Sequence, residues 1–300
     1  MWLLSKRMLA ALVAVALWST NAWAANVALA RMSVGWLLLV QYAAAVGALL
    51  AARAIGHRRR GESSGRPSMT GSAAAIGVVG LTATVFLQYL AFAAAPIVAA
   101  NVLTYGWPLL ATLWVAATLR TRRAIGLAGL AVLGFGGVAL IFSNPAAPAS
   151  APAGGPGATW GYAAALGSAV FMAIYTLASS RVHASATDIL IPATVVGTLV
   201  AAAVTASTGD SWPQPAGWLA AAYIGIGPMA AGYGLWTVAM AGGGAERLGP
   251  IGYATPLLST LLLLATGAPS SATTLIGVGL VLACSIGVLA AQHPSRAHAA

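Results

Sequence analysis

The chain has 300 residues, of which 60% are hydrophobic and only 6% are charged, with 14 Lys and Arg against 4 Asp and Glu. Soluble domains carry roughly a quarter charged residues and disordered chains have low hydrophobicity, so this composition excludes both classes and indicates an integral membrane protein. The basic residues lie in short clusters between apolar runs and form no continuous stripe, which argues against a nucleic-acid partner.

Apolar segments follow one another along the whole chain, separated by charges, prolines and stretches rich in Gly and Ser. Each segment is long enough for a helix to cross about 30 Å of hydrocarbon. The segments are continuous and do not alternate between polar and apolar residues, which favours helices over the strands of a barrel. We therefore predict an all-α integral membrane protein with ten transmembrane helices, over residues 9–28, 35–55, 71–93, 97–118, 124–142, 159–180, 188–207, 216–241, 248–267 and 273–291.

The first segment has an alternative interpretation. Lys6 and Arg7, the apolar stretch after them and the small residues around Ala22 and Ala24 together resemble a cleavable signal peptide. The apolar run continues past that point to Leu29, and this favours a retained helix.

The basic residues predict the orientation. If the N-terminus is cytoplasmic and ten helices alternate in direction, every Lys and Arg except Arg31 falls on the cytoplasmic side. Short cytoplasmic loops of membrane proteins are enriched in such residues. We therefore expect both termini to be cytoplasmic.

An internal repeat divides the chain into halves. The sequence from Tyr105 to Leu113 matches that from Tyr253 to Leu261, 148 residues later, with six of nine positions identical. We predict a first five-helix repeat over residues 1–148 and a second over 149–300. Because five is odd, the second repeat inserts in the opposite orientation, and inverted repeats of this kind are typical of transporters that bind substrate near the membrane midplane.

Ionisable residues are absent from the middle of the predicted helices. All four acids, Glu62, Asp188, Asp210 and Glu246, fall in loops or at helix ends. We therefore expect no buried carboxylate relay for protons. No His, Cys, Asp and Glu set has metal-ligand spacing, and no nucleophile has a base beside it, so the sequence predicts no metal, no cofactor and no enzymatic activity.

Aromatic and amide side chains occupy the middle of the predicted helices instead. An amide in hydrocarbon is unfavourable unless it finds a partner, so we expect these amides to face the interior of the bundle. Rings offer stacking and cation–π contacts, and the neutral polar groups can bind a carboxylate or an amine. The candidate substrate-binding residues are Trp18, Asn21, Gln88, Asn101, Tyr105, Trp107, Tyr175, Tyr233, Trp236 and Tyr253.

These features resemble a known family. Trp18-Ser19 in the first predicted helix, the paired proline motifs at Pro108 and Pro256 and the five-plus-five arrangement resemble EamA-type exporters of the drug/metabolite transporter superfamily. Asn101 followed by Tyr105-x-Trp107-Pro108 resembles the bacterial aromatic amino acid exporters of that family. The chain departs from many members at the ends of the fourth and ninth helices, where it has no glutamate.

The resemblance implies a multi-pass transporter of the bacterial inner membrane with a small-molecule substrate. We expect export of aromatic or neutral amino acids, or related small metabolites, by alternating access and without obligatory proton coupling. Efflux of hydrophobic cations is the alternative transport function, and a non-transporting membrane protein is the alternative class. The expected partners are the substrate and the lipid bilayer, and a monomer is compatible with the sequence.

Overall fold

A computed structural model describes residues 2–60, 71–107, 109–110, 123–143, 157–179, 184–240, 248, 251–252 and 254–292. Across these residues the regular secondary structure is helical and contains no strand. Five of the described helical spans are long and apolar enough to cross a membrane, namely Lys6–Leu29, Val34–Gly56, Gly71–Ala94, Ala158–Ser179 and Ala186–Thr208. The prediction of an all-helical membrane protein is confirmed at this level.

The helices follow the apolar segments closely. In the first half they are α1 (Trp2–Ser19), α2 (Asn21–Leu29), α3 (Val34–Arg60), α4 (Gly71–Ala75), η1 (Ile76–Leu81), α5 (Thr82–Ala94), α6 (Ile97–Thr104) and α8 (Arg123–Ser143). In the second half they are α9 (Ala158–Ser179), α10 (Ala186–Thr208), α11 (Pro215–Ile224), η2 (Gly225–Gly232), α12 (Tyr233–Met240), α14 (Ala254–Ala265) and α15 (Ala272–Gln292). The helices η1 and η2 are π-helical turns.

Several predicted helices are interrupted. The first segment bends at Thr20, between α1 and α2, where the Thr20 hydroxyl bonds the carbonyl of Leu17 at 2.8 Å. The helix predicted over 97–118 is interrupted by a turn at Tyr105 and Gly106 and resumes at Trp107, while residues 108 and 111–118 lie outside the described residues. A proline at position 108 has no amide hydrogen to donate to the preceding helical turn, and this accounts for the break.

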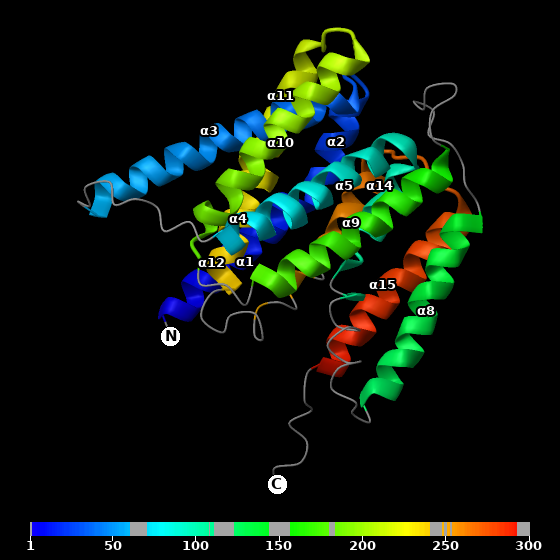
Figure 1. Cartoon of the computed structure of the whole chain (residues 1–300). Helices are drawn as coiled ribbons and strands as arrows, with labels where there is room; N and C mark the ends of the chain where they lie inside the picture. The colour runs from blue at the N-terminus through cyan, green and yellow to red at the C-terminus, as the bar shows by residue number, and fades with distance from the viewer. Residues whose placement is uncertain are drawn as a thin grey trace.

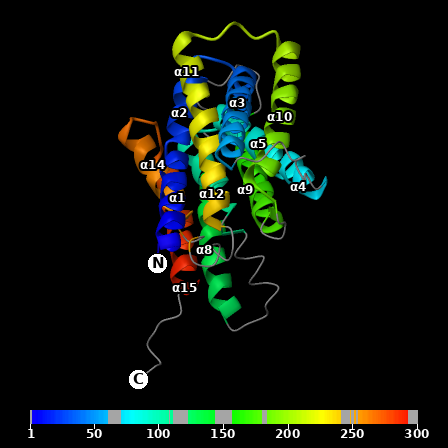
Figure 2. The same ribbon diagram turned by 90° about the vertical axis from the view of Figure 1, so that its left-hand side faces the viewer.

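Helices from the two halves of the chain pack side by side (Figures 1 and 2). The helices α3 and α10 run antiparallel, because Gly35 at the start of α3 lies against Thr205, and Arg53 near its end forms a 3.6 Å ion pair with Asp188. The helices α8 and α15 are also antiparallel and lie together in both views. The helices α5 and α9 form a third close pair.

Glycines allow the backbones to approach at these crossings. A Cβ on Gly137 of α8 would lie 2.6 Å from the carbonyl oxygen of Gly277 in α15, and a Cβ on Gly277 would lie 2.7 Å from that of Gly137. Small residues serve this purpose in membranes, where helices associate through close van der Waals packing.

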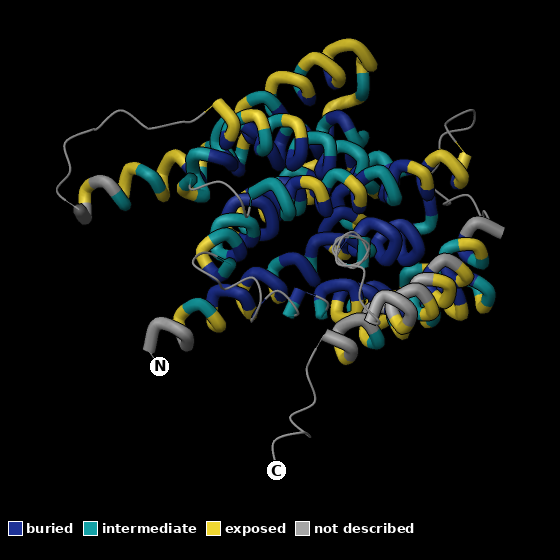
Figure 3. The backbone as a smooth tube through the Cα atoms, turned by 60° about the horizontal axis from the view of Figure 1, so that its bottom comes forward, coloured by how far each residue is buried: buried dark blue, intermediate teal, exposed yellow. Residues whose placement is uncertain are grey.

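The outward faces of the bundle are apolar. Leu219, Val132 and Leu199 are 75%, 73% and 66% exposed, and Figure 3 shows exposed residues on the outer sides of helices whose inner sides are buried. Large contiguous apolar surfaces of this kind are unfavourable in water and are normal where lipid covers the protein.

Two of the closest backbone contacts involve the π-helical turns. A Cβ on Gly77 of η1 would collide with the carbonyl oxygen of Ile189 in α10, and a Cβ on Gly225 of η2 would collide with that of Gln41 in α3. Gly225 follows Gly77 by 148 residues, and Ile189 follows Gln41 by the same number. The two contacts therefore join corresponding positions of the two sequence repeats, which are 148 residues apart.

Substituting Gly225 by Ala should lower the stability of the protein, because the added methyl group must push α3 away from η2. Overpacking of this kind costs about 1–3 kcal/mol. We expect thermal unfolding in detergent to shift to lower temperature. Gly234→Ala is the matched control, because a Cβ there has nothing within 4 Å, and equal melting temperatures for the two variants would contradict the close contact.

Candidate functional site

A cavity lies among helices from both halves of the chain, with about 480 Å³ of empty space when the open solvent at its mouth is included. Its walls come from α1, α2, α3 and α5, the end of α6 and the turn after it, and α9, α11, η2 and α12. The residues that line it are Trp18, Asn21, Gln41, Thr84, Val85, Gln88, Tyr89, Thr104, Tyr105, Trp107, Met172, Ile224, Pro228, Met229 and Tyr233.

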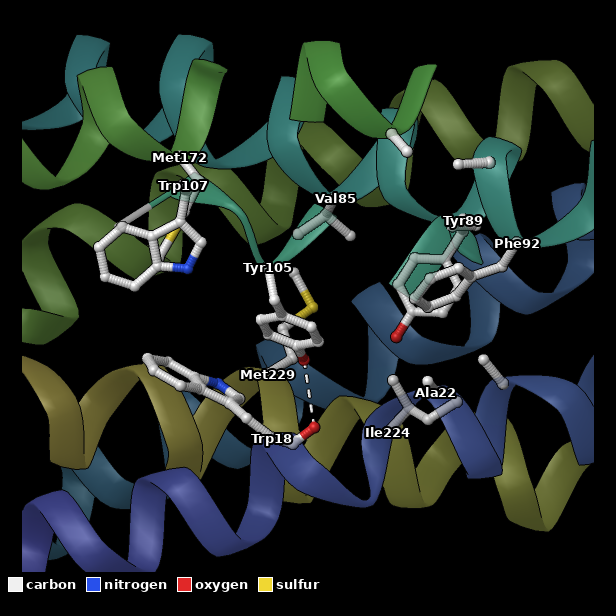
Figure 4. Packing of buried hydrophobic residues seen from close by; sticks show 14 of the residues in the cluster. Trp18, Ala22, Val85, Tyr89, Phe92, Tyr105, Trp107, Met172, Ile224 and Met229 are labelled. Carbon is white, nitrogen blue, oxygen red and sulfur yellow. Dashed lines mark hydrogen bonds between the residues drawn. The ribbon is translucent and has the colours of Figure 1, made fainter. Parts of the chain in front are cut away.

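Six of the ten candidate residues from the sequence lie on this wall, namely Trp18, Asn21, Gln88, Tyr105, Trp107 and Tyr233. Side chains from segments far apart in the chain face one another here (Figure 4). The expectation that the amides face the interior is confirmed, since Asn21, Gln88 and Asn101 are 5%, 6% and 0% exposed.

The other four candidates are placed differently. Trp236 and Tyr175 are buried beside the cavity, where Trp236 packs on Trp18 with ring centroids 5.2 Å apart and Tyr175 meets Tyr233 edge-on at 6.3 Å. Asn101 is turned away from the cavity and accepts a hydrogen bond from Ser259 of α14 at 3.1 Å. Tyr253 lies outside the described residues.

Trp18 connects α1 to the middle of the eighth predicted span. Its indole Nε1 donates to the carbonyl oxygen of Pro228 at 3.0 Å, within η2. Its ring contacts Tyr233 edge-on at 5.1 Å. A Cβ on Gly232 would lie 2.7 Å from the indole nitrogen. A glycine at this position therefore avoids a clash with the Trp18 ring.

Two tyrosines complete the polar contacts of the wall. The Tyr105 hydroxyl donates to the carbonyl of Trp18 at 3.1 Å, as the dashed line in Figure 4 marks. The Tyr89 hydroxyl donates to Oδ1 of Asn21 at 2.7 Å. Both bonds are buried, where water cannot substitute for them, so they fix the positions of these rings and of the Asn21 amide.

Nine lining residues were not among the sequence candidates. Met172, Met229, Val85 and Ile224 are apolar, and in a membrane span an apolar residue gives no sign of whether it faces lipid or a cavity. The polar ones, Gln41, Thr84, Thr104 and Tyr89, are detectable as polar residues within apolar segments, together with the helix-interrupting Pro228.

The described residues of the cavity wall carry no formal charge. No carboxylate, imidazole, ammonium or guanidinium group is among the described residues that line it. Asp188 pairs with Arg53 near one end of α10, away from the cavity wall. Within the described parts of the chain, no three His, Cys, Asp or Glu side chains come together as a metal site.

The arrangement can therefore hold a small molecule by ring contacts and neutral hydrogen bonds. The model of the EamA-like transporter family matches residues 5–143 and 159–290, which together cover most of the chain. The chain belongs to the EamA-like transporter family. It is a multi-pass membrane transporter and not an enzyme.

Two known proteins are similar over long stretches. The aromatic amino acid exporter YddG of Ancylobacter novellus is 33% identical over 223 residues, which is 70% of this chain and 71% of the exporter. A solved crystal structure of a protein is 26% identical and has a TM-score of 0.64, over 94% of this chain and 96% of that one. The second similarity supports the fold described above.

The Tyr89–Asn21 hydrogen bond should be measurable as an energetic coupling. In a double-mutant cycle of Tyr89→Phe and Asn21→Ala, followed by unfolding in detergent, we expect a coupling of about 0.5–1.5 kcal/mol, because each single change removes the same bond. The control pair is Tyr89→Phe with Ser259→Ala, which share no contact and should be additive within about 0.5 kcal/mol. A Tyr89–Asn21 coupling as small as the control value would contradict the hydrogen bond.

Proposed function

We propose that this protein exports aromatic or neutral amino acids, or related small metabolites, across the bacterial inner membrane. The observation that carries the proposal is the composition of the cavity wall, which combines aromatic rings with neutral amides and hydroxyls. The similarity to an aromatic amino acid exporter supports the same substrate class.

The chemistry of the wall suits a zwitterion with an apolar side chain. Trp18, Trp107 and Tyr233 can stack on an aromatic ring or attract an ammonium group by cation–π contact. Asn21 and Gln88 can hydrogen-bond polar groups without introducing a charge that a buried site would have to neutralise. We assign these five residues and Tyr105 as substrate contacts.

For the mechanism we propose alternating access by two inverted repeats, residues 1–148 and 149–300, with ten crossings and both termini cytoplasmic. The equivalent contacts of Gly77 with Ile189 and of Gly225 with Gln41 support this symmetry, because each half packs its π-helical turn on the other half in the same way. Inverted repeats can close a pathway on one side while opening it on the other, with substrate held between them.

We further propose that transport follows the substrate gradient without obligatory proton coupling. Proton-coupled transporters use ionisable groups within the membrane. The described cavity wall is built from neutral amides, hydroxyls, rings and thioethers.

Efflux of hydrophobic cations is a second candidate function. The cluster of Trp18, Tyr233 and Trp236 offers several ring faces to a cation. The described residues that line the cavity include no carboxylate to offset the charge, and this makes the zwitterion the better fit.

Truncation of Trp107 should impair transport. In proteoliposomes, Trp107→Ala should lower the initial rate of phenylalanine counterflow about tenfold, because a large stacking surface is lost, while Trp107→Phe should retain most activity. Trp160→Ala is the matched control, since Trp160 is 52% exposed at the start of α9 and does not line the cavity.

Three outcomes of that assay would count against the proposal. Wild-type rates equal to those of empty liposomes would refute amino acid transport. Wild-type rates in Trp107→Ala would refute the site. Strong transport of hydrophobic cations with none of amino acids would favour the second candidate.

An imposed pH gradient should leave phenylalanine flux almost unchanged. We expect initial rates with and without the gradient to agree within about twofold, because the described residues of the cavity wall offer no carboxylate that could carry a proton. The measurement is uptake into proteoliposomes at fixed external pH. A severalfold stimulation by the gradient would overturn the uncoupled mechanism.

A further inference from the structure

The side chain of Gln41, in α3, is an unpaired amide on the cavity wall. The residue is 0% exposed, and neither its nitrogen nor its oxygen has a hydrogen-bond partner among the described residues. An amide buried without a partner is unfavourable by several kcal/mol in hydrocarbon. The equivalent position of the second half is Ile189, so an apolar side chain is compatible with this place in the helix packing.

Thr104, at the end of α6, presents a second unpaired group to the same cavity. It is 3% exposed, and its hydroxyl has no partner among the described residues. Several buried threonines satisfy their hydroxyl on the carbonyl four residues earlier, as Thr84 does with Gly80 at 2.7 Å and Thr205 with Ala201 at 2.8 Å. The hydroxyls of Thr255 and Thr260 in α14 lack a partner among the described residues, as that of Thr104 does, but neither residue is among those that line the cavity. Thr104 makes no such bond, so its hydroxyl is free for a ligand.

Several other polar groups of the wall are already engaged in hydrogen bonds within the protein. The Trp18 indole donates to Pro228, the Tyr105 hydroxyl donates to Trp18, and the Asn21 oxygen accepts from Tyr89. Much of the unused hydrogen-bonding capacity of the cavity therefore lies at Gln41 and Thr104. A buried polar group of a binding site is satisfied when the ligand supplies the missing partner, and this discriminates strongly against ligands that lack it.

We propose that Gln41, with Thr104, is the polar subsite that binds the amino and carboxyl groups of a zwitterionic substrate. The Gln41 Nε2 donates to the carboxylate, its Oε1 accepts from the ammonium group, and the Thr104 hydroxyl offers a further hydrogen bond. A molecule with both groups satisfies both atoms of the amide, whereas an amine or an acid alone leaves one atom unpaired. This inference rests on the proposed transport of amino acids and makes Gln41 the residue that selects for them.

The test compares three molecules that share an aromatic ring: phenylalanine, phenethylamine and 3-phenylpropionate. In proteoliposomes, Gln41→Met keeps the size of the side chain and removes its hydrogen bonds. We expect it to raise KM for phenylalanine about tenfold or more and to change KM for phenethylamine by less than about threefold. Thr104→Val should raise KM for phenylalanine, and Thr104→Ser should restore it.

The matched control is Gln214→Met, at an exposed position before α11 that does not line the cavity. Its KM for phenylalanine should equal that of the wild type. The melting temperature of Gln41→Met in detergent should equal or exceed that of the wild type, because an unpaired amide has been removed. A purely structural glutamine would instead lower the melting temperature and leave the selectivity unchanged.

The outcomes separate this inference from the proposed function. If the wild type carries phenylalanine and Gln41→Met does so with unchanged KM and unchanged preference over phenethylamine, the subsite is wrong and the transport function stands. If the wild type carries no amino acid at all, the proposed function fails and the subsite fails with it.

Discussion

In the hydrocarbon of a membrane the indole N–H of Trp18 has no water to bond, and the carbonyl of Pro228 is the partner it finds. This hydrogen bond joins α1 to η2, so it ties the first half of the chain to the second across the cavity. The ring that it fixes then packs on Tyr233 and Trp236, and the carbonyl of the same residue accepts from Tyr105. Trp18 therefore contacts η2, α12 and the turn after α6.

Close packing around the cavity follows from a related constraint. Lipid is as apolar as the helices, so helices are held together by close contact and by the few polar bonds available. Among the described residues, Gly77 and Gly225 supply two of the closest backbone contacts, at the π-helical turns of η1 and η2, against α10 and α3. The cavity lies beside η2, whose Pro228 and Met229 line it together with aromatic side chains from both halves of the chain.

The sequence predicted an all-helical membrane protein correctly, because long apolar runs leave few alternatives in a membrane; five of the described helices are long and apolar enough to cross one. It also identified Trp18, Asn21 and Tyr105 as candidates, because polar groups within a membrane-spanning helix are unfavourable unless they find a hydrogen-bond partner inside the protein. Asn101 lies one helical turn before Tyr105, but it is not among the residues that line the cavity, and its side chain accepts a hydrogen bond from Ser259, which is 158 residues away in the sequence. Met172 and Met229 were beyond prediction, because the rotation of a helix about its axis depends on contacts distant in sequence.

The central claim is that a small zwitterion binds between the two halves of the chain, and photolabelling tests it most directly. A diazirine analogue of phenylalanine can be cross-linked to the protein in native membranes and the labelled peptides identified by mass spectrometry. The account predicts labels on α5 and on the stretch from η2 to α12, all of them displaced by excess phenylalanine. Labels confined to the lipid-facing side chains, such as Val132 and Leu199, and unaffected by phenylalanine, would contradict it.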